Sequence, residues 1–335
     1  MTGLKTIITT LSKAMSITGH ERRAFDTVRE LVCDAFDEIY SDPIGSLFLV
    51  RRCGKDNAPC IMLDAHLDEI GMIVTGIKDN GFLSVANIGG IDTRILPASI
   101  VRVYGEEEFD AVVVSTPPHL QKPGDANKLP AISDILIDTG YTSETLKKIA
   151  PVGTPVGFEP AVTELLNGRL AGKGMDDKAC AAILLDAVMN MEKPEDFDIV
   201  VTLTTREEVS GVGARCAAYG LNPTAAIIFD VNFAKTPDVD KSKSLTMDEG
   251  LGVSISAVTH RRLTKSIIEY AKENEIKSTG TNADNMPSIG YGLAVAVVSL
   301  PLKNMHTPSE IISLEDAENC SKLISGYVSS RKWML

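Results

Sequence analysis

The chain has 335 residues, of which 44% are hydrophobic, and a formal net charge of −12 at pH 7. This length allows one large domain or two ordinary ones. The negative charge argues against a nucleic-acid partner, because phosphate binding needs a basic surface, and it also disfavours an anionic membrane surface. No apolar run approaches the ~20 residues that a membrane span needs, so we expect no membrane partner.

Cysteine usage bears on the cellular compartment. The six cysteines are scattered, and none forms a C-x-x-C pair that would indicate a thiolate zinc site or a redox pair. The first residues begin an amphipathic helix over residues 4–14 and lack the apolar core of a secretory signal. We therefore expect a cytoplasmic protein with reduced thiols.

An apolar run over residues 59–65 predicts a buried strand, and His66 follows it directly. Asp68 comes two residues later. At the end of a strand this His-x-Asp pattern suits a metal site, because the imidazole can bind an ion while the carboxylate holds the other ring nitrogen. A lone His-x-Asp pattern is a weak signal, so its weight depends on further candidate ligands.

The sequence pattern changes over residues 72–164. Strand-like segments dominate there, separated by turns rich in glycine and proline. A module of this length lies within the usual range for a domain, so we predict a β-rich domain inserted into a main domain that is formed by residues 1–71 and 165–335. His119 lies in a polar loop of this module, which we expect to be exposed, and we leave it out of the metal site.

Asp176 and Asp177 precede a predicted helix over residues 179–189. In an isolated pair of acids, one is most simply the N-cap of the helix, but a carboxylate at this place can instead bridge two cations. The preceding Gly172-Lys173-Gly174 lacks the spacing of a phosphate-binding loop, so we exclude that function.

Two more acids follow a strand. Residues 199–204 are apolar and β-branched, as in a buried central strand, and Glu207 and Glu208 come shortly after them. Adjacent side chains at the end of a strand point to opposite sides. One carboxylate can therefore bind a metal ion while its neighbour transfers a proton.

The last third of the chain adds two candidates. Residues 224–229 predict a strand that leads into Asp230, and residues 293–300 predict the last strand, shortly before His306. We expect residues 278–284, between these strands, to form a loop. A final helix is expected to begin at Ser313.

The candidate side chains share a position, because most of them follow strands and ligands of open α/β sheets bind beyond the carboxyl ends of the strands. We therefore predict an α/β fold with a mixed open sheet flanked by helices. The candidate metal ligands are His66, Asp176, Glu208, Asp230 and His306. This set has no thiolate and suits zinc, cobalt or manganese rather than calcium. Two such cations ~3.5–4 Å apart form a hydrolytic centre, in which Glu207 would deprotonate the bridging water and then protonate the leaving group.

Seven segments carry a further signal as a set: Ala65-His66-Leu67-Asp68-Glu69-Ile70-Gly71, Asn87-Ile88-Gly89-Gly90-Ile91-Asp92, Pro117-Pro118-His119-Leu120, Ile137-Asp138-Thr139-Gly140, Met175-Asp176-Asp177-Lys178, Glu207-Glu208-Val209 and Met305-His306-Thr307-Pro308-Ser309-Glu310. With these segments the sequence resembles, over nearly its whole length, the M42 family of dinuclear-metal aminopeptidases, the tetrahedral aminopeptidases.

The resemblance implies two divalent metal ions per subunit, with His66, Asp176 and Asp230 around one ion and Asp176, Glu208 and His306 around the other. It also implies that Asp68 orients His66 and that Glu207 is the general base. The implied reaction is removal of N-terminal residues from peptides. The implied assembly is a dodecamer built from dimers, with the inserted β-rich domain involved in assembly and access.

The sequence departs from the family pattern at four positions. Lys178 and Lys303 stand where arginine-like residues are usual, Ser210 replaces a glycine, and Asn282 replaces an acidic residue. None of these is an implied metal ligand. Asn282 and Lys303 bear on substrate preference and subunit contacts.

Two other functions stay open. An endoglucanase-like glycosidase needs two carboxylates ~5–10 Å apart across a sugar ring, but the adjacent Glu207 and Glu208 diverge, and Trp333 is the only tryptophan that could stack on a sugar. The other alternative is a catalytically inactive, metal-binding assembly protein. The intact Glu207 argues against it.

Overall fold

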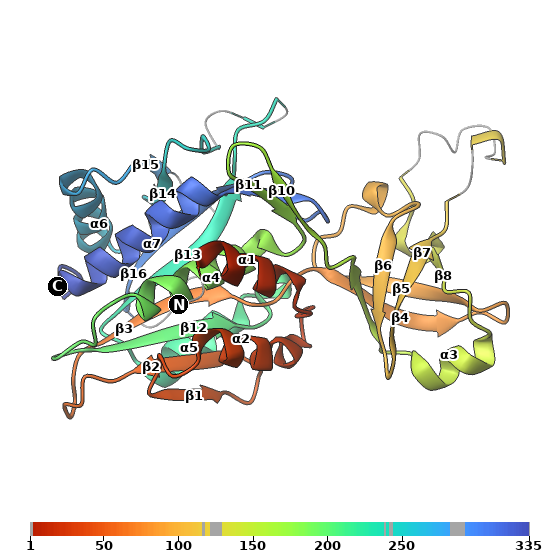
Figure 1. The fold of residues 1–335 in the computed structure, drawn as a ribbon, viewed down its shortest axis with the longest axis horizontal. Coiled ribbons are helices and arrows are strands. Elements are labelled where there is room, and N and C mark those ends of the chain that lie inside the picture. Colours follow the sequence, from red (N-terminus) through yellow and green to blue (C-terminus); the bar gives the residue numbers. More distant parts are fainter. Residues whose placement is uncertain are drawn as a thin grey trace.

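The computed structural model describes residues 3–115, 118–120, 129–237, 239–240, 244–281 and 292–334. Figure 1 shows two parts, a large sheet flanked by helices and a smaller β-structure beside it. Asn282 lies outside the described residues, as do residues 121–128 of the loop that follows His119. Within the described part of the chain, no helix is long and apolar enough to cross a membrane.

The helices are α1 (Leu4–Lys13), α2 (Phe25–Val32), α3 (Ser143–Ile149), α4 (Met175–Met189), α5 (Val212–Leu221), α6 (Arg261–Glu273) and α7 (Leu314–Ser329). The strands are β1 (Glu38–Ser41), β2 (Leu47–Arg51), β3 (Cys60–His66), β4 (Gly71–Ile77), β5 (Phe82–Ile88), β6 (Ile100–Tyr104), β7 (Glu108–Val113), β8 (Leu136–Asp138), β9 (Pro155–Phe158), β10 (Val162–Leu165), β11 (Arg169–Gly172), β12 (Asp198–Thr204), β13 (Ala225–Phe233), β14 (Leu251–Ser254), β15 (Ser278–Thr281), β16 (Ala294–Leu302) and β17 (Glu310–Ser313).

The main sheet has eight strands in the order β1-β2-β12-β3-β13-β16-β14-β15. Its centre, from β12 to β16, is parallel, whereas β2 and β14 pair antiparallel with the strands that flank this centre. The central strands are apolar and buried on both faces, as parallel strands covered by helices usually are. The predicted mixed α/β fold is confirmed.

Helices cover both faces of this sheet, with different side chains. The larger core lies on the face covered by α1, α4 and α7, and it is mostly aliphatic. On the opposite face α5 contributes three alanines, Ala214, Ala217 and Ala218, which lie close to the sheet because their side chains are short. Three short strands, β10, β11 and β17, form a separate sheet that leads into α7.

The smaller part is a closed barrel with the strand order β4-β5-β8-β7-β6-β9. It lies at the right of Figure 1 and has an aliphatic core of its own, separate from the core of the main sheet. The chain enters the barrel from β3 and leaves it after β9, so the barrel interrupts the main fold. The division at residues 71/72 and 164/165 into two domains stays a prediction.

Three expectations about local structure were wrong. β13 continues through Asp230 to Phe233, because it pairs with β16 along its whole length. Residues 278–281 form the edge strand β15 rather than a loop, because they pair in parallel with β14. Glu207 and Glu208 do not extend β12, which ends at Thr204; they lie in a short 3₁₀ helix, Glu207–Val209.

Candidate metal centre

The ends of parallel strands bring the first candidates to one edge of the sheet. β12 and β3 pair so that Thr204 lies beside His66, and β13 pairs with the other side of β3. The turn after β12, the end of β3 and Asp230 therefore lie next to each other. This is the edge at which open α/β sheets bind their ligands.

His66 is the last residue of β3, and its buried imidazole has a neighbour at each nitrogen. Nε2 lies 3.0 Å from Oδ1 of Asp176, and Nδ1 lies 3.0 Å from the backbone carbonyl oxygen of Asp68. The carboxylate of Asp68 is farther away, with Oδ1 at 3.6 Å from Nδ1. Donation from Nδ1 to the carbonyl oxygen would leave the lone pair of Nε2 free to bind a metal ion. The orienting role of the Asp68 carboxylate stays a prediction.

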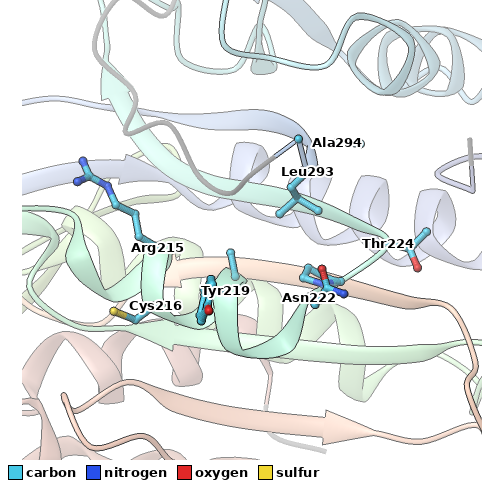
Figure 2. A pocket seen from close by; sticks show the side chains of 10 residues that line it. Arg215, Cys216, Tyr219, Asn222, Thr224, Leu293 and Ala294 are labelled. Atoms are coloured by element: carbon cyan, nitrogen blue, oxygen red, sulfur yellow. The ribbon is translucent and has the colours of Figure 1, made fainter.

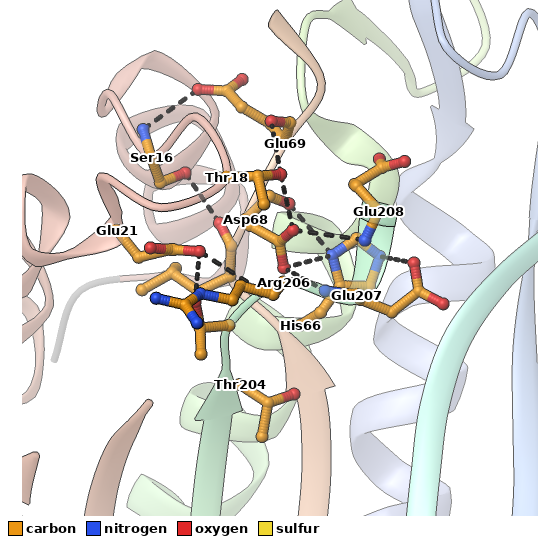
Figure 3. Close-up of polar contacts among 12 residues, drawn as sticks. Ser16, Thr18, Glu21, His66, Asp68, Glu69, Thr204, Arg206, Glu207 and Glu208 are labelled. Carbon is orange, nitrogen blue, oxygen red and sulfur yellow. Dashed lines mark hydrogen bonds and ion pairs between the residues drawn. The ribbon is translucent and has the colours of Figure 1, made fainter. Parts of the chain in front are cut away.

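The carboxylate of Asp68 has a second set of contacts, shown in Figure 3. Oδ1 accepts a hydrogen bond from the backbone N–H of Glu207 at 3.0 Å, and Oδ2 accepts one from the N–H of Glu208 at 3.3 Å. The hydroxyl of Thr18 donates to Oδ2 at 2.8 Å. Asp68 is fully buried, so it holds the backbone of both glutamates in a fixed place.

The turn before the glutamates is unusual in its backbone. Arg206 has a left-handed conformation, with φ of 59°, which is uncommon for a residue other than glycine. Because the chain turns there, the two glutamates differ in environment: the side chain of Glu207 is 38% exposed and that of Glu208 only 4%. The two carboxylates therefore differ in exposure because of the turn, not because of strand alternation.

Glu21 supports this turn from the N-terminal part of the chain. It is buried, and its Oε1 accepts hydrogen bonds from the N–H of Gly19 at 2.9 Å and the N–H of Arg206 at 3.3 Å. The hydroxyl of Thr205 donates to the same oxygen. Burial, the largest cause, raises the pKa of Glu21 above its usual value, although the hydrogen bonds from Thr205 and Gly19 act in the opposite direction.

Asp176 lies between the two candidate histidines. Oδ1 faces His66 at 3.0 Å, and Oδ2 lies 3.4 Å from Nε2 of His306. Asp176 and Asp177 have non-helical backbone angles at the start of α4, and the N-cap is Gly174, which makes no side-chain capping bond. The carboxylate oxygens of Asp177 make no hydrogen bond and those of Asp176 face the two histidines, so neither side chain caps this helix, and Asp176 has the placement of a bridging carboxylate.

His306 joins Asp176 to Glu208. Its Nε2 lies 3.2 Å from Oε2 of Glu208, and its Nδ1 lies 3.1 Å from the backbone carbonyl oxygen of Gly90. Gly90 follows barrel strand β5, and a Cβ there would lie only 2.9 Å from Nδ1 of His306. A side chain at position 90 would thus displace the imidazole, so the glycine permits this close approach.

Asp177 and Asp230 form a second group with His66. One ligand atom from each of these three residues lies within 4.8 Å of the others, and the same holds for His66, Asp176 and Glu208. Asp177 is fully buried, and neither of its carboxylate oxygens has a hydrogen-bond partner. A buried carboxylate without partners is costly, which is what a nearby cation would relieve.

The electrostatics of the cluster also fit a cation. Burial raises the pKa values of Asp177, Asp230 and Glu208, and the neighbouring acids add to this effect. Although burial acts in the opposite direction, hydrogen bonds from the two histidines lower the pKa of Asp176, and Asp176 and Glu208 raise that of His306 to about 11.

No lysine or arginine of the described chain segments forms an ion pair with these four acids; the ion-pair partners of Asp176 and Glu208 are imidazoles. Imidazole and carboxylate are ligands suited to zinc, cobalt or manganese. The residues present therefore fit divalent metal ions.

Three departures from the family pattern can be located, and one of them, Lys303, forms a β-bridge with Ile311 through backbone hydrogen bonds. Lys178 is buried, and its Nζ lies 2.8 Å from Oε1 of Glu69 and donates to the carbonyl oxygen of Ala14 at 2.7 Å. Lys173 contacts the same carboxylate. Ser210 is exposed and donates to the carbonyl oxygen of Arg206. Neither Lys173 nor Lys178 contacts the candidate ligands. The observed role of these two lysines is to join the start of α4 to the segment before β4.

Several residues that support the site have no role that could be predicted from their sequence context. Thr18, Glu21 and Glu310 contact its backbone or its acids, and Asp177 lies inside it. Asp177 and Glu310 lie in motifs that were recognised, but their contacts depend on the folded chain. His119 is exposed in the short helix Pro118–Leu120, as expected.

A cavity lies elsewhere in the molecule. Figure 2 shows it beside α5 and the amino ends of β13 and β16, with a volume of about 910 Å³. Its lining residues include Arg215, Tyr219 and Asn222 but no imidazole or carboxylate group. We therefore assign no catalytic role to it.

A mixed α/β sheet with imidazoles and carboxylates clustered beyond its parallel strands defines a class, the hydrolases that use metal ions. Residues 45–323 match the family of M42 glutamyl aminopeptidases. The chain belongs to this metal-dependent family, and it is a peptide-hydrolysing aminopeptidase; the resemblance noted in the sequence is confirmed.

Individual relatives agree with this family. A lysyl aminopeptidase of Pyrococcus furiosus is 31% identical over 95% of this chain and 94% of its own length. The TET1 peptidase of Pyrococcus horikoshii, which can assemble into a tetrahedron or a large octahedral shell, is 26% identical with a TM-score of 0.85 over 96% and 98% of the two chains. An endoglucanase of Thermotoga maritima is 27% identical with a TM-score of 0.82 over 98% of each chain.

Proposed function

We propose that this aminopeptidase binds two divalent ions, zinc, cobalt or manganese, at the cluster described above. The ligands would be His66, Asp176 and Asp230 for the first ion and Asp176, Glu208 and His306 for the second. Bound there, the ions would polarise the scissile carbonyl group and lower the pKa of an attacking water. The observation that carries this proposal is the placement of Asp176, whose two oxygens face the two histidines.

Glu207 is the general base in this proposal. Its carboxylate is partly exposed, and Oε2 lies 3.9 Å from Nε2 of His66, so it is beside the cluster and open to substrate. It takes a proton from the attacking water and delivers it to the amine nitrogen that leaves when the peptide bond breaks. Asp68, which accepts the N–H of Glu207, would keep this carboxylate in place.

A chelator experiment tests the proposal. Activity on a panel of aminoacyl-p-nitroanilides should disappear when a chelator removes the ions, and it should return when zinc, cobalt or manganese is added. Activity that survives complete removal of metal would contradict the proposal.

Because the chain carries a net charge of −12 and a relative is named a lysyl aminopeptidase, we expect basic or neutral N-terminal residues to be preferred over acidic ones.

We also propose self-association into a dodecamer built from dimers, with the barrel in the subunit contacts. The support is the likeness to the TET1 peptidase of Pyrococcus horikoshii, which can assemble into a tetrahedron or a large octahedral shell. Light scattering should give a mass about twelve times the 36.0 kDa of one chain. A monomer at micromolar concentration would contradict this assembly.

The glycosidase alternative has one observation in its favour, the likeness to an endoglucanase. The site does not favour it, because Glu207 and Glu208 face the same imidazole cluster rather than opposite sides of a sugar-sized gap. Hydrolysis of a glucan that persists in chelator would support the alternative.

A further inference from the structure

Glu310 is a buried acid that the proposed ligand sets do not use. It is the first residue of β17, and it pairs with Gly172 of β11. Gly172 shortly precedes the start of α4, where Asp176 lies. The strand pairing therefore puts the Glu310 side chain against the beginning of α4, next to the cluster.

The two oxygens of Glu310 serve two different backbone segments. Oε2 accepts a hydrogen bond from the N–H of Asp176 at 3.1 Å, and Oε1 accepts one from the N–H of His306 at 2.8 Å. Hydrogen bonds to a carboxylate are stronger than those between neutral groups. One side chain thus fixes the distance between two segments that are far apart in the sequence.

His306 needs such a restraint. Its backbone is left-handed, with φ of 62°, and Asn304 two residues earlier has φ of 58°. A residue with a Cβ adopts this conformation only where surrounding contacts hold it. The bond to Oε1 of Glu310 is such a contact, and the carbonyl oxygen of Gly90 positions the ring from the other side.

We propose that Glu310 is a positioning residue for the second metal ion, because it sets the spacing between Asp176 and His306. This inference rests on the proposed function. His66 and Asp230, the other ligands of the first ion, make no hydrogen bond to Glu310 among those found in the described residues. Loss of Glu310 should therefore weaken the second ion far more than the first.

The test is to titrate zinc into metal-stripped Glu310→Gln protein and to measure its binding by titration calorimetry. Glutamine has one carbonyl oxygen, so its NH₂ group would face one of the two backbone N–H groups. We expect the second zinc ion to bind about 10- to 100-fold more weakly, the usual effect of losing a group that supports a metal ligand, while the first binds with near wild-type affinity. Anomalous diffraction at the zinc edge would show which ion is lost.

Two further variants separate positioning from other effects. Glu310→Asp keeps the charge but is one methylene shorter and cannot reach both N–H groups, so it should also weaken the second ion. Asp316→Asn is the matched control, because Asp316 is equally buried and accepts the N–H of Asp248 at 2.8 Å, away from the cluster. It should bind both ions normally.

The outcomes are distinct. Wild-type protein that binds no zinc would reject the proposed function. Wild-type protein that binds two ions, together with a Glu310→Gln variant that binds both with unchanged affinity, would reject the inference alone. Normal binding by Glu310→Asp would show that charge, not position, matters. If both variants fail to fold while Asp316→Asn folds, Glu310 serves the fold rather than the second ion, and the inference fails.

Discussion

Glu207 and Glu208 are neighbours in the sequence with different surroundings in the fold. Glu208 is buried against His306, whereas Glu207 is more than one-third exposed beside His66. Their N–H groups donate to different oxygens of one Asp68 carboxylate. Asp68 holds the backbone of both glutamates, so the two acids differ only in the groups that their side chains contact.

This difference predicts that a glutamine substitution has a different effect at each of the two positions. Glu207→Gln should keep both metal ions and lower turnover by about 10²- to 10⁴-fold, because it removes a proton acceptor but no ligand. Glu208→Gln should lose metal, because it removes a ligand oxygen. Metal content measured by atomic absorption, together with kcat, distinguishes the two. Near-normal turnover in Glu207→Gln would reject its role as the base.

At the residue scale, the placement of His66 near the carboxyl edge of the sheet could be predicted from the apolar run before it, and Asp230 lies at the same edge although β13 continues past it. Glu21 could not, because its contact with Arg206 joins residues that only folding brings together. The N-cap interpretation of the Asp176 pair could be rejected only from contacts in the folded chain, because the Asp177 carboxylate makes no hydrogen bond and that of Asp176 faces the two histidines.

At the scale of elements, Asp248 joins three parts of the main domain. It lies in the loop before β14, and its Oδ1 accepts hydrogen bonds from Arg169 of β11 at 2.8 Å and from the hydroxyl of Ser313 at 2.6 Å. Its own N–H donates to Asp316 in the first turn of α7. The Arg169 guanidinium, as the largest cause, lowers the pKa of Asp248 to about 2.

This lowered pKa predicts that the difference in stability between wild type and Asp248→Asn depends on pH. The charged form of Asp248 stabilises the fold above the unfolded pKa of about 4, and this contribution is lost as the pH falls toward about 2. Asp248→Asn should therefore lower the free energy of unfolding by about 1 kcal/mol at pH 7, a modest value because the pair is partly exposed and screened. Asparagine tolerates the left-handed backbone at this position.

Urea unfolding of wild type and variant at several pH values checks this prediction. The difference should be constant above about pH 5 and should shrink below it. Asp79→Asn, in an exposed turn, is the matched control and should show little difference at any pH. A difference that grows as the pH falls would contradict the assigned cause.

The elements themselves could be predicted unevenly. The amphipathic α1 and the capped α7 agree with their sequence patterns, and Ser313 does accept the N–H of Asp316. The strand β15 was missed because Ser278-Thr279-Gly280-Thr281 has no apolar alternation, and pairing with β14 forms it. The end of β13 was placed too early for the same reason, since its pairing with β16 is not visible in local composition.

At the scale of the molecule, the barrel and the part that contains the main sheet meet at Ile17. Ile17 is fully buried and forms a small apolar cluster with Met15 and Tyr104. Its backbone pairs with Glu69 through a single β-bridge. A Cβ on Gly71 of β4 would lie 2.8 Å from its side chain, so glycine lets Ile17 approach the barrel closely. The barrel also carries Gly90, whose carbonyl oxygen contacts His306.

These two contacts predict that the barrel's attachment affects catalysis. Ile17→Ala should lower the free energy of unfolding by about 2–5 kcal/mol, the usual cost of this truncation in a core, and kcat/KM by about 10- to 100-fold through displacement of His306. Ile137→Ala, at an equally buried position inside the barrel core, should cost similar stability. Its kcat/KM should stay near wild type, because Ile137 does not join the two parts. Calorimetric melting and kinetics well below both melting temperatures would check the pair. Equal kcat/KM in the two variants would show that the barrel and the metal centre work independently.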